Sequence, residues 1–151
     1  MDAIIFCTGH NMDIPFLDDH NPYTSPGEPP NLYRNVFPLH PDPAIRSSLA
    51  FLGHAIIPFP GFIMHELVAM SIPQVWLGRS PLPPLHEMKR WNRNHLASRQ
   101  ALPSKQKMKS THYAALLPEI EHIFWLDQTA GTGVFAHIGG RSWFSLRAWK
   151  F

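Results

Sequence analysis

The chain of 151 residues contains one cysteine, Cys7, and this scarcity excludes two kinds of site. A single thiol cannot form an intramolecular disulfide, and it cannot supply a zinc site that is built from several cysteines. Cys7 lies within the apolar run Ala3–Cys7. We therefore expect a buried, inert thiol, because a reactive thiol needs an electropositive and partly exposed setting.

The sequence also lacks a dinucleotide-binding glycine loop, since no G-x-G-x-x-G follows a predicted strand. Gly131-Thr132-Gly133 lacks the third glycine and follows a predicted helix. A run of about 18 apolar residues is absent, so the sequence predicts no membrane span. We find no secretory signal pattern, and we expect a cytoplasmic location.

Charge of one sign is not in excess either. The chain has 13 lysines and arginines against 11 acidic residues, and a net charge of +2 does not demand a polyanionic partner. Seven of the cationic residues lie between Lys89 and Lys109, which leaves open a phosphate- or nucleic-acid-binding face. A solvated helix face is the commoner explanation, and we predict no nucleic-acid partner. The ten histidines lack the H-x-x-x-H spacing of a zinc helix, so we predict no metal site.

What the sequence does contain is a series of short apolar runs separated by proline-rich connections. A hydrophobic share of 44% indicates a folded chain, and 16 prolines require many turns. The run at residues 3–7 predicts a strand that is buried on both faces, as in a parallel sheet. Tyr33–Phe37 and Leu49–Leu52 predict two further short strands, the second of which ends at Gly53. Residues 11–31 indicate a polar loop.

Three helices are predicted after these strands. The first, Phe62–Leu77, is apolar nearly all round and therefore buried; Pro73 should kink it and Gly78 should end it. The second begins after Ser80, and the third covers residues 118–127 and ends before Gly131. Their inward-facing residues are expected to be Leu85, Met88 and Leu96 in the second helix, and Ile120, Ile123 and Phe124 in the third.

Several short motifs resemble one family in their order along the chain. Ile4–His10 is similar to the FATGY strand and turn of flavin-containing monooxygenases, with Cys7 in place of Ala and His10 in place of Tyr. The later motifs of the family follow in its order, as Pro15–Leu17, Leu32–Pro38, Leu49–Gly53 and Glu66-Leu67 followed by Gly78. The resemblance covers roughly residues 2–90.

The resemblance implies an α/β fold with two Rossmann-like domains, of which this chain would be the C-terminal portion. Residues 1–80 would be the remainder of the FAD/NADPH-binding region, with a few strands and a buried helix. Residues 81–151 would form a helical lobe rich in aromatic side chains, within the same structural unit. The chain would then belong to a larger enzyme and would be inactive alone.

The family implies FAD and NADPH as cofactors. The resemblance further implies that a flavin hydroperoxide would oxygenate a small nitrogen or sulfur nucleophile, or a carbonyl compound. The resemblance places six residues near the cofactor and indicates no catalytic residue; the six are Thr8, Gly9, Gly53, His54, Phe62 and Glu66. His54 stands where related flavoproteins often carry Asp, and Val68, Met70 and Ser71 replace Gln, Arg and Trp of the family's helix motif.

An alternative from another class stays open. The chain could be a non-enzymatic, truncated paralogue that docks on a full-length partner or a membrane surface through an exposed apolar sheet edge and a basic face.

Overall fold

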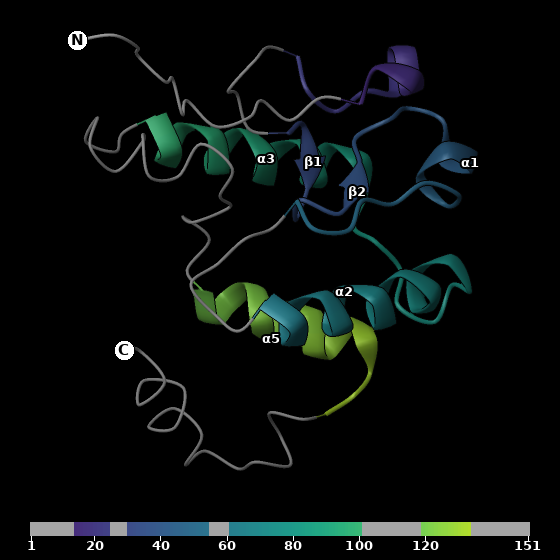
Figure 1. Cartoon of the computed structure of the whole chain (residues 1–151), viewed down its shortest axis with the longest axis vertical. Coiled ribbons are helices and arrows are strands. Elements are labelled where there is room, and N and C mark those ends of the chain that lie inside the picture. The colour runs from purple at the N-terminus through teal and green to yellow at the C-terminus, as the bar shows by residue number, and fades with distance from the viewer. Residues whose placement is uncertain (1–13, 25–29, 55–60, 101–118, 134–151) are drawn as a thin grey trace, which may run out of the picture.

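The computed structural model describes residues 14–24, 30–54, 61–100 and 119–133. Its elements form a mixed α/β structure in which helices dominate a two-stranded sheet (Figure 1). In chain order they are the 3-10 helix η1 (Pro15–His20), β1 (Leu32–Tyr33), β2 (Phe37–Pro38), α1 (Pro43–Arg46), α2 (Gly61–Trp76), α3 (Leu85–Gln100) and α5 (Glu119–Ala130). The predicted strand at residues 3–7 and the aromatic-rich stretch 141–151 lie outside the described residues.

The segment predicted as one strand, Tyr33–Phe37, is instead an antiparallel hairpin. Tyr33 pairs with Phe37, and the Val36 N–H donates to the Tyr33 carbonyl at 3.1 Å to close the turn. Arg34 and Asn35 occupy its centre with φ of +52° and +56°. Two successive left-handed residues match the right-handed twist of the paired strands, so the chain reverses here. Pro38 ends β2, as expected from its missing N–H.

The prediction of a second strand at Leu49–Leu52 is wrong, because this described segment has no strand geometry. Its Phe51 N–H donates to the Val36 carbonyl at 2.8 Å, and one such bond fixes the run beside the hairpin tip without extending the sheet. Leu52 is 51% exposed, whereas a strand covered on both faces would hide it. The described strands are antiparallel, and the Rossmann-like sheet stays a prediction.

Helix α2 confirms the prediction for Phe62–Leu77 within one residue at each end. Gly78, with φ of +70°, ends it and donates to the Val75 carbonyl. The expectation of burial on all sides is wrong. One face is buried, while Phe62, Met70, Trp76 and Leu77 are between 41% and 71% exposed. The apolar composition of α2 therefore does not indicate which of its faces packs against another element. The kink at Pro73 stays a prediction.

Helices α3 and α5 confirm the other two helix predictions. In α3, Met88 is fully buried, Leu85 and Leu96 are partly buried, and the remaining buried positions are polar, namely Asn92 and His95. In α5, Ile123 is buried as predicted, but Phe124 is 41% exposed and Leu126 takes the inward position. Phe124 lies one residue, about 100°, around the helix from Ile123. The side chain of Ile120 lies outside the described set.

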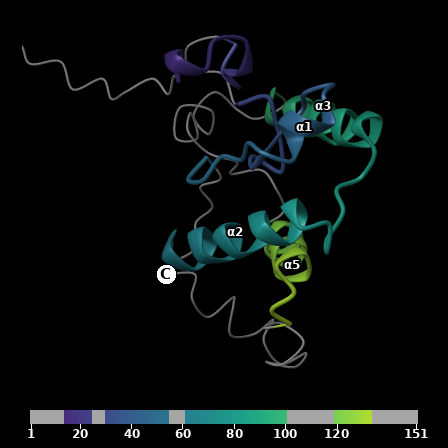
Figure 2. The same cartoon turned by 90° about the vertical axis from the view of Figure 1, so that its right-hand side faces the viewer.

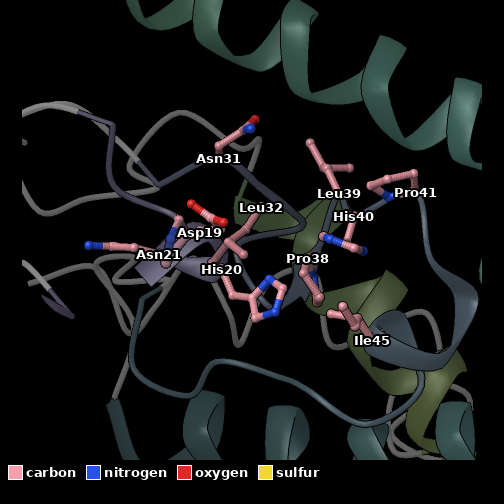
Figure 3. A pocket seen from close by; sticks show the side chains of 11 residues that line it. Asp19, His20, Asn21, Asn31, Leu32, Pro38, Leu39, His40, Pro41 and Ile45 are labelled. Carbon is pink, nitrogen blue, oxygen red and sulfur yellow. The ribbon is translucent and has the colours of Figure 1, made fainter. Parts of the chain in front are cut away.

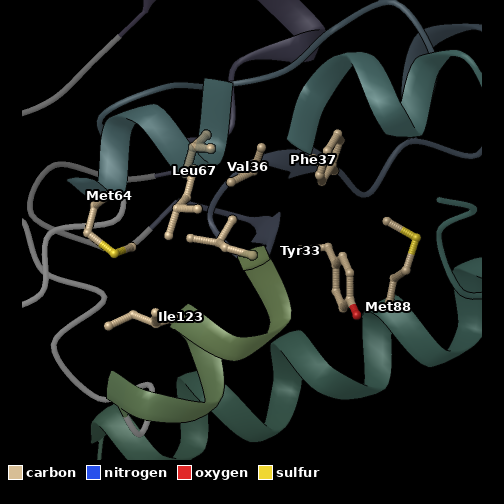
Figure 4. Packing of buried hydrophobic residues seen from close by; sticks show 9 residues of the cluster. Tyr33, Val36, Phe37, Met64, Leu67, Met88 and Ile123 are labelled. Atoms are coloured by element: carbon tan, nitrogen blue, oxygen red, sulfur yellow. The ribbon is translucent and has the colours of Figure 1, made fainter. Parts of the chain in front are cut away.

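The core joins the hairpin to all three longer helices. α2 packs along α5, α3 packs on β1, and α1 packs on β2 (Figures 1 and 2). Between these groups lies one cluster of buried side chains, in which Figure 4 shows Tyr33 facing Met88. The cluster consists of Tyr33, Val36, Phe37, Met64, Leu67, Val68, Met88, Ile123 and Leu126. Ser71, fully buried, adds a polar link, since its Oγ lies 2.7 Å from the Leu67 carbonyl and 3.1 Å from the Leu126 carbonyl of α5.

The hairpin tip carries a buried cation into this assembly. The guanidinium carbon of Arg34 lies 5.3 Å from the ring centroid of Trp125 and 4.9 Å from that of Trp91. Its Nη2 is 2.9 Å from Glu121 Oε1. Within the described part, Nε and Nη1 of Arg34 are buried without hydrogen-bond partners. Cation–π attraction therefore stabilises the arginine, and the two unpaired donors oppose it.

No helix in the described ranges is long and apolar enough to cross a membrane.

Candidate functional site

Four of the six residues predicted to lie near a cofactor fall in the described structure. Gly53 and His54 end the segment after α1, and Phe62 and Glu66 belong to the first two turns of α2. Thr8 and Gly9 lie outside the described residues. The geometry of the predicted site therefore rests on the four residues between Gly53 and Glu66.

Gly53 brings the segment after α1 against helix α2. A Cβ built on Gly53 would lie 3.9 Å from Nε2 of His65, which is an ordinary contact distance. The space would admit a small side chain, but the φ of +86° is one that residues with a Cβ rarely adopt. Glycine is thus required here by backbone conformation. The turn places the chain beside the first turns of α2.

His54 is held by Tyr23, which is distant in sequence, and by the nearby Phe51. Its Nδ1 and the Tyr23 hydroxyl form a hydrogen bond, and its ring meets the Phe51 ring edge to face at 5.6 Å. Burial lowers the pKa of His54 and raises the pKa of Tyr23 to about 12, so both groups are neutral at pH 7. The Tyr23 hydroxyl can donate to Nδ1 or accept from it, according to the tautomer of His54. A phenol O–H is more acidic than the N–H of a neutral imidazole, and when the phenol donates to Nδ1 the imidazole proton resides on Nε2. His54 then offers Nε2–H as a donor.

Phe62 and Glu66 lie one turn apart and both are exposed. Phe62 is 71% exposed, which is unusual for a large aromatic side chain. These residues share the exposed face of α2 with Met70. The described contact between Gly53 and this helix is made with His65, which lies between Phe62 and Glu66 in the sequence.

The three departures from the family's helix motif are explained in part by packing. Val68 belongs to the core and Ser71 contacts α5, so neither side chain faces the exposed side of α2. An apolar Val and a small Ser suit these buried positions. Met70 is 41% exposed, and packing does not account for the replacement of a cation there.

Sequence reasoning missed Tyr23, Phe51 and His65. Tyr23 and His54 are 31 positions apart, so no local pattern signals their hydrogen bond. The contact between Gly53 and His65 crosses residues 55–60, which lie outside the described structure. Proximity of Gly53 to the helix was nevertheless expected from the order of the motifs.

The described residues of the candidate site fit one part of a flavin. An exposed aromatic ring and a neutral imidazole donor suit a planar heterocycle with polar edges, since cofactor sites combine apolar walls with a few placed polar groups. Among the described residues, no three of the His, Cys, Asp or Glu side chains are grouped so as to hold a metal ion.

Comparison with known proteins identifies the family. Residues 1–126 match the family described as flavin-binding monooxygenase-like. The whole chain is 28% identical to monooxygenase aurF of Gibberella zeae, across 29% of that protein's length. It is 31% identical to flavin-containing monooxygenase FMO GS-OX3 of Arabidopsis thaliana, across 86% of this chain and 27% of that protein. FMO GS-OX-like 7 of the same plant is 38% identical across 58% of this chain and 18% of its own.

The chain thus spans less than a third of the length of these relatives. No solved structure matches it significantly. The match covers most of the chain, including the turn at Gly53 and all of α2 and α3. The chain belongs to the flavin-binding monooxygenase-like family.

Proposed function

We propose that this chain supplies the C-terminal portion of an FAD- and NADPH-dependent monooxygenase. The site at Gly53, His54, Phe62 and Glu66 would border the isoalloxazine ring, with Thr8 and Gly9 completing it. The substrate would be a small nitrogen or sulfur nucleophile or a carbonyl compound. A reduced flavin supplies oxygen activation in such enzymes, and the protein binds, orients and excludes water. A cytoplasmic location and a boundary between two lobes near residue 80 stay predictions.

One observation carries the proposal: the family match includes the turn at Gly53 and the start of α2, where Phe62 is exposed. The first N–H groups of a helix lack intrahelical acceptors and carry partial positive charge, which favours the electron-rich edge of a reduced flavin. His54 would donate from Nε2 toward a ring nitrogen or carbonyl, and Phe62 would cover the ring from water. Since the sequence contains no G-x-G-x-x-G, phosphate binding would fall to other polypeptide.

The test is a titration of the purified 151-residue chain with FAD and with riboflavin, followed by flavin fluorescence. The proposal expects weak, saturable binding of both, with comparable affinity, because the chain would contact the ring system that they share. A Phe62→Ala variant should bind riboflavin about fivefold more weakly, the effect of one lost aromatic contact of roughly 1 kcal/mol. Trp76→Ala is the matched control, since it removes an exposed aromatic about four turns further along the same helix.

Three outcomes would contradict the proposal. If FAD bound a hundredfold more tightly than riboflavin, the chain would hold the phosphates itself. If neither flavin bound saturably, or if the two variants behaved alike, the exposed start of α2 would not be a flavin surface.

The exposed apolar face of α2 favours a second candidate function, that of an interaction module. Met70 and Trp76 on this helix and Leu77 directly after it are at least 41% exposed, and exposed apolar patches commonly mark interfaces. In this case the partner would be a full-length member of the family. Co-elution of the chain with such a protein in gel filtration, lost in Trp76→Arg and kept in Arg79→Glu, would support docking; no co-elution would exclude it.

A further inference from the structure

The side chain of His54 contacts two aromatic rings, and one of them also supplies a hydrogen-bonding group. The Tyr23 hydroxyl bonds Nδ1 of His54, and the two rings are inclined at 46° with centroids 5.6 Å apart. The Phe51 ring meets the imidazole at 89°, also with centroids 5.6 Å apart. The orientation of the imidazole therefore depends on how firmly Tyr23 and Phe51 are themselves held.

The backbone that carries Tyr23 is fixed by hydrogen bonds. Its N–H donates to Oδ1 of Asn21 at 3.0 Å, and the Asn31 N–H donates to the carbonyl of the buried Pro22 at 2.7 Å. Figure 3 shows Asn21 and Asn31, which lie on the chain that leaves η1 and on the chain that enters β1. Oδ1 of Asn31 also accepts from Nδ2 of Asn92 in α3 at 2.7 Å. Tyr23 is thus tied to the start of the hairpin and to a helix.

Phe51 is fixed to the tip of the same hairpin. Its N–H donates to the Val36 carbonyl at 2.8 Å, and the residue is buried. Both rings that contact His54 are therefore held by one framework, although the three residues come from separate segments of the chain. A functional side chain needs such support, because only packing and hydrogen bonds from its neighbours keep it in one orientation.

The Tyr23 hydroxyl can do more than support the ring. In a neutral imidazole one nitrogen carries the proton and the other accepts, and the partner of one nitrogen decides which tautomer is present. A hydroxyl that donates to Nδ1 leaves the proton on Nε2. Burial raises the pKa of Tyr23 to about 12, so the hydroxyl keeps its proton at neutral pH and remains able to donate.

We propose that Tyr23 is a positioning residue for His54: its hydroxyl donates to Nδ1, selects the tautomer with the proton on Nε2, and holds the ring so that this N–H is available to a ligand. The inference rests on the proposed function, in which the N–H meets the flavin. Tyr23 would make no contact with the flavin and would act through His54.

The first test examines the imidazole of the full chain without flavin. At about pH 8 the ring is neutral, and long-range proton–nitrogen correlation spectra show which of its nitrogens carries the proton. His54→Gln identifies the signals of His54 among those of the ten histidines. We expect the Nε2–H tautomer in the unmodified chain. Tyr23→Phe, which removes only the hydroxyl, should lower the ratio of Nε2–H to Nδ1–H about fivefold, the factor for one net hydrogen bond.

Tyr33→Phe is the matched control for this spectrum. It also removes one phenol hydroxyl, but the rings that Tyr33 contacts in the described ranges are those of Trp91 and Trp125. The tautomer ratio of His54 should therefore be unchanged in Tyr33→Phe.

The second test measures whether Tyr23 acts through His54. Tyr23→Phe should weaken riboflavin binding by up to about fivefold, because the N–H that would bond the flavin is no longer held in place. In the His54→Ala background the same substitution should leave the affinity unchanged, since the group that it positions is gone.

The inference is overturned if Nδ1 carries the proton in the unmodified chain, or if Tyr23→Phe leaves the nitrogen shifts of His54 as they were. It is also overturned if Tyr33→Phe changes these shifts equally, or if the loss of riboflavin affinity persists in the His54→Ala background. Failure of the proposed function gives a different result: the unmodified chain would bind no riboflavin, while the tautomer ratio would still respond to Tyr23→Phe.

Discussion

The guanidinium carbon of Arg34 lies 4.9 Å from the ring centroid of Trp91, so a cation–π contact ties the hairpin tip to helix α3. Arg34→Met should change the free energy of unfolding by less than about 1 kcal/mol, because it removes the cation–π contacts and the ion pair with the exposed Glu121 together with two buried, unpaired donors. Combined with Trp91→Leu, it should reveal a coupling energy of about 1 kcal/mol.

Urea unfolding of the four proteins of this double-mutant cycle measures the coupling. A second cycle, which pairs Arg34→Met with Trp76→Leu, is the control, since Trp76 is exposed on α2 and is not among the rings that Arg34 contacts in the described ranges. Coupling of equal size in both cycles would show that the Trp91 ring contributes nothing specific.

Gly53→Ala should destabilise the protein by roughly 1 kcal/mol, because alanine pays that cost for a left-handed conformation. Gly78→Ala should cost about the same, since its φ is +70° and a Cβ there meets nothing within 4 Å. Only the change at Gly53 should also weaken riboflavin binding. Thermal unfolding and flavin titration of the two variants separate the effects, and equal flavin binding would remove Gly53 from the proposed site.

His122 should make the protein sensitive to acid. Burial, followed by electrostatic interaction with Arg34 and His95, lowers the pKa of His122 from 6.5 to about 3. The unfolded chain therefore takes up a proton below pH 6.5 that the folded chain does not bind until near pH 3. The stability that His122 contributes is fully present above pH 6.5. As the pH falls from 6.5 toward 3, the free energy of unfolding decreases by about 1.4 kcal/mol per pH unit.

The variant His122→Leu should reduce the loss of stability between pH 6 and pH 4 by about 2 kcal/mol. The fall that remains includes His54, whose pKa is also lowered. His86→Leu is the control, because the His86 side chain is 77% exposed. Urea titrations at the two pH values give the difference, and a profile unchanged by His122→Leu would contradict the assignment.

Ser71→Ala should destabilise the protein by about 1 kcal/mol, because the buried hydroxyl lies within hydrogen-bond distance of carbonyls on both α2 and α5. Ser98→Ala removes a hydroxyl that bonds the Asn94 carbonyl within one exposed helix turn, and should change stability far less. Urea titrations measure the free energy of unfolding of both variants. If it decreased by the same amount in each, the contact of Ser71 with α5 would not contribute to stability.

The helices could be predicted from the sequence because their boundaries are set locally. Gly78 ends α2 and Gly131 follows α5, each with positive φ. The faces of the helices were less predictable, since composition does not say which side meets a partner. Phe124 and the exposed half of α2 were misassigned for this reason.

The hairpin was missed although its signal was present. Asn35 is a residue type that tolerates the left-handed conformation, and Arg34-Asn35 sits at the centre of the apolar run. In the site, the order of the motifs predicted the neighbourhood of Gly53 and α2. The pairing of Tyr23 with His54 depends on the folding of a long intervening segment, and no local pattern encodes it.

The order of the helices has a consequence for the chain during synthesis. α2 packs on α5, although α3 lies between them in sequence and packs on the hairpin instead. When α2 and α3 leave the ribosome, the side chains of Met64 and Leu67 still lack Ile123 and Leu126, which arrive later. Contacts between segments that are distant in sequence form slowly. The nascent chain therefore passes through a stage in which this apolar face of α2 is exposed. The packing of α5 covers this face and so ends the stage at which chaperones or other chains could bind to it.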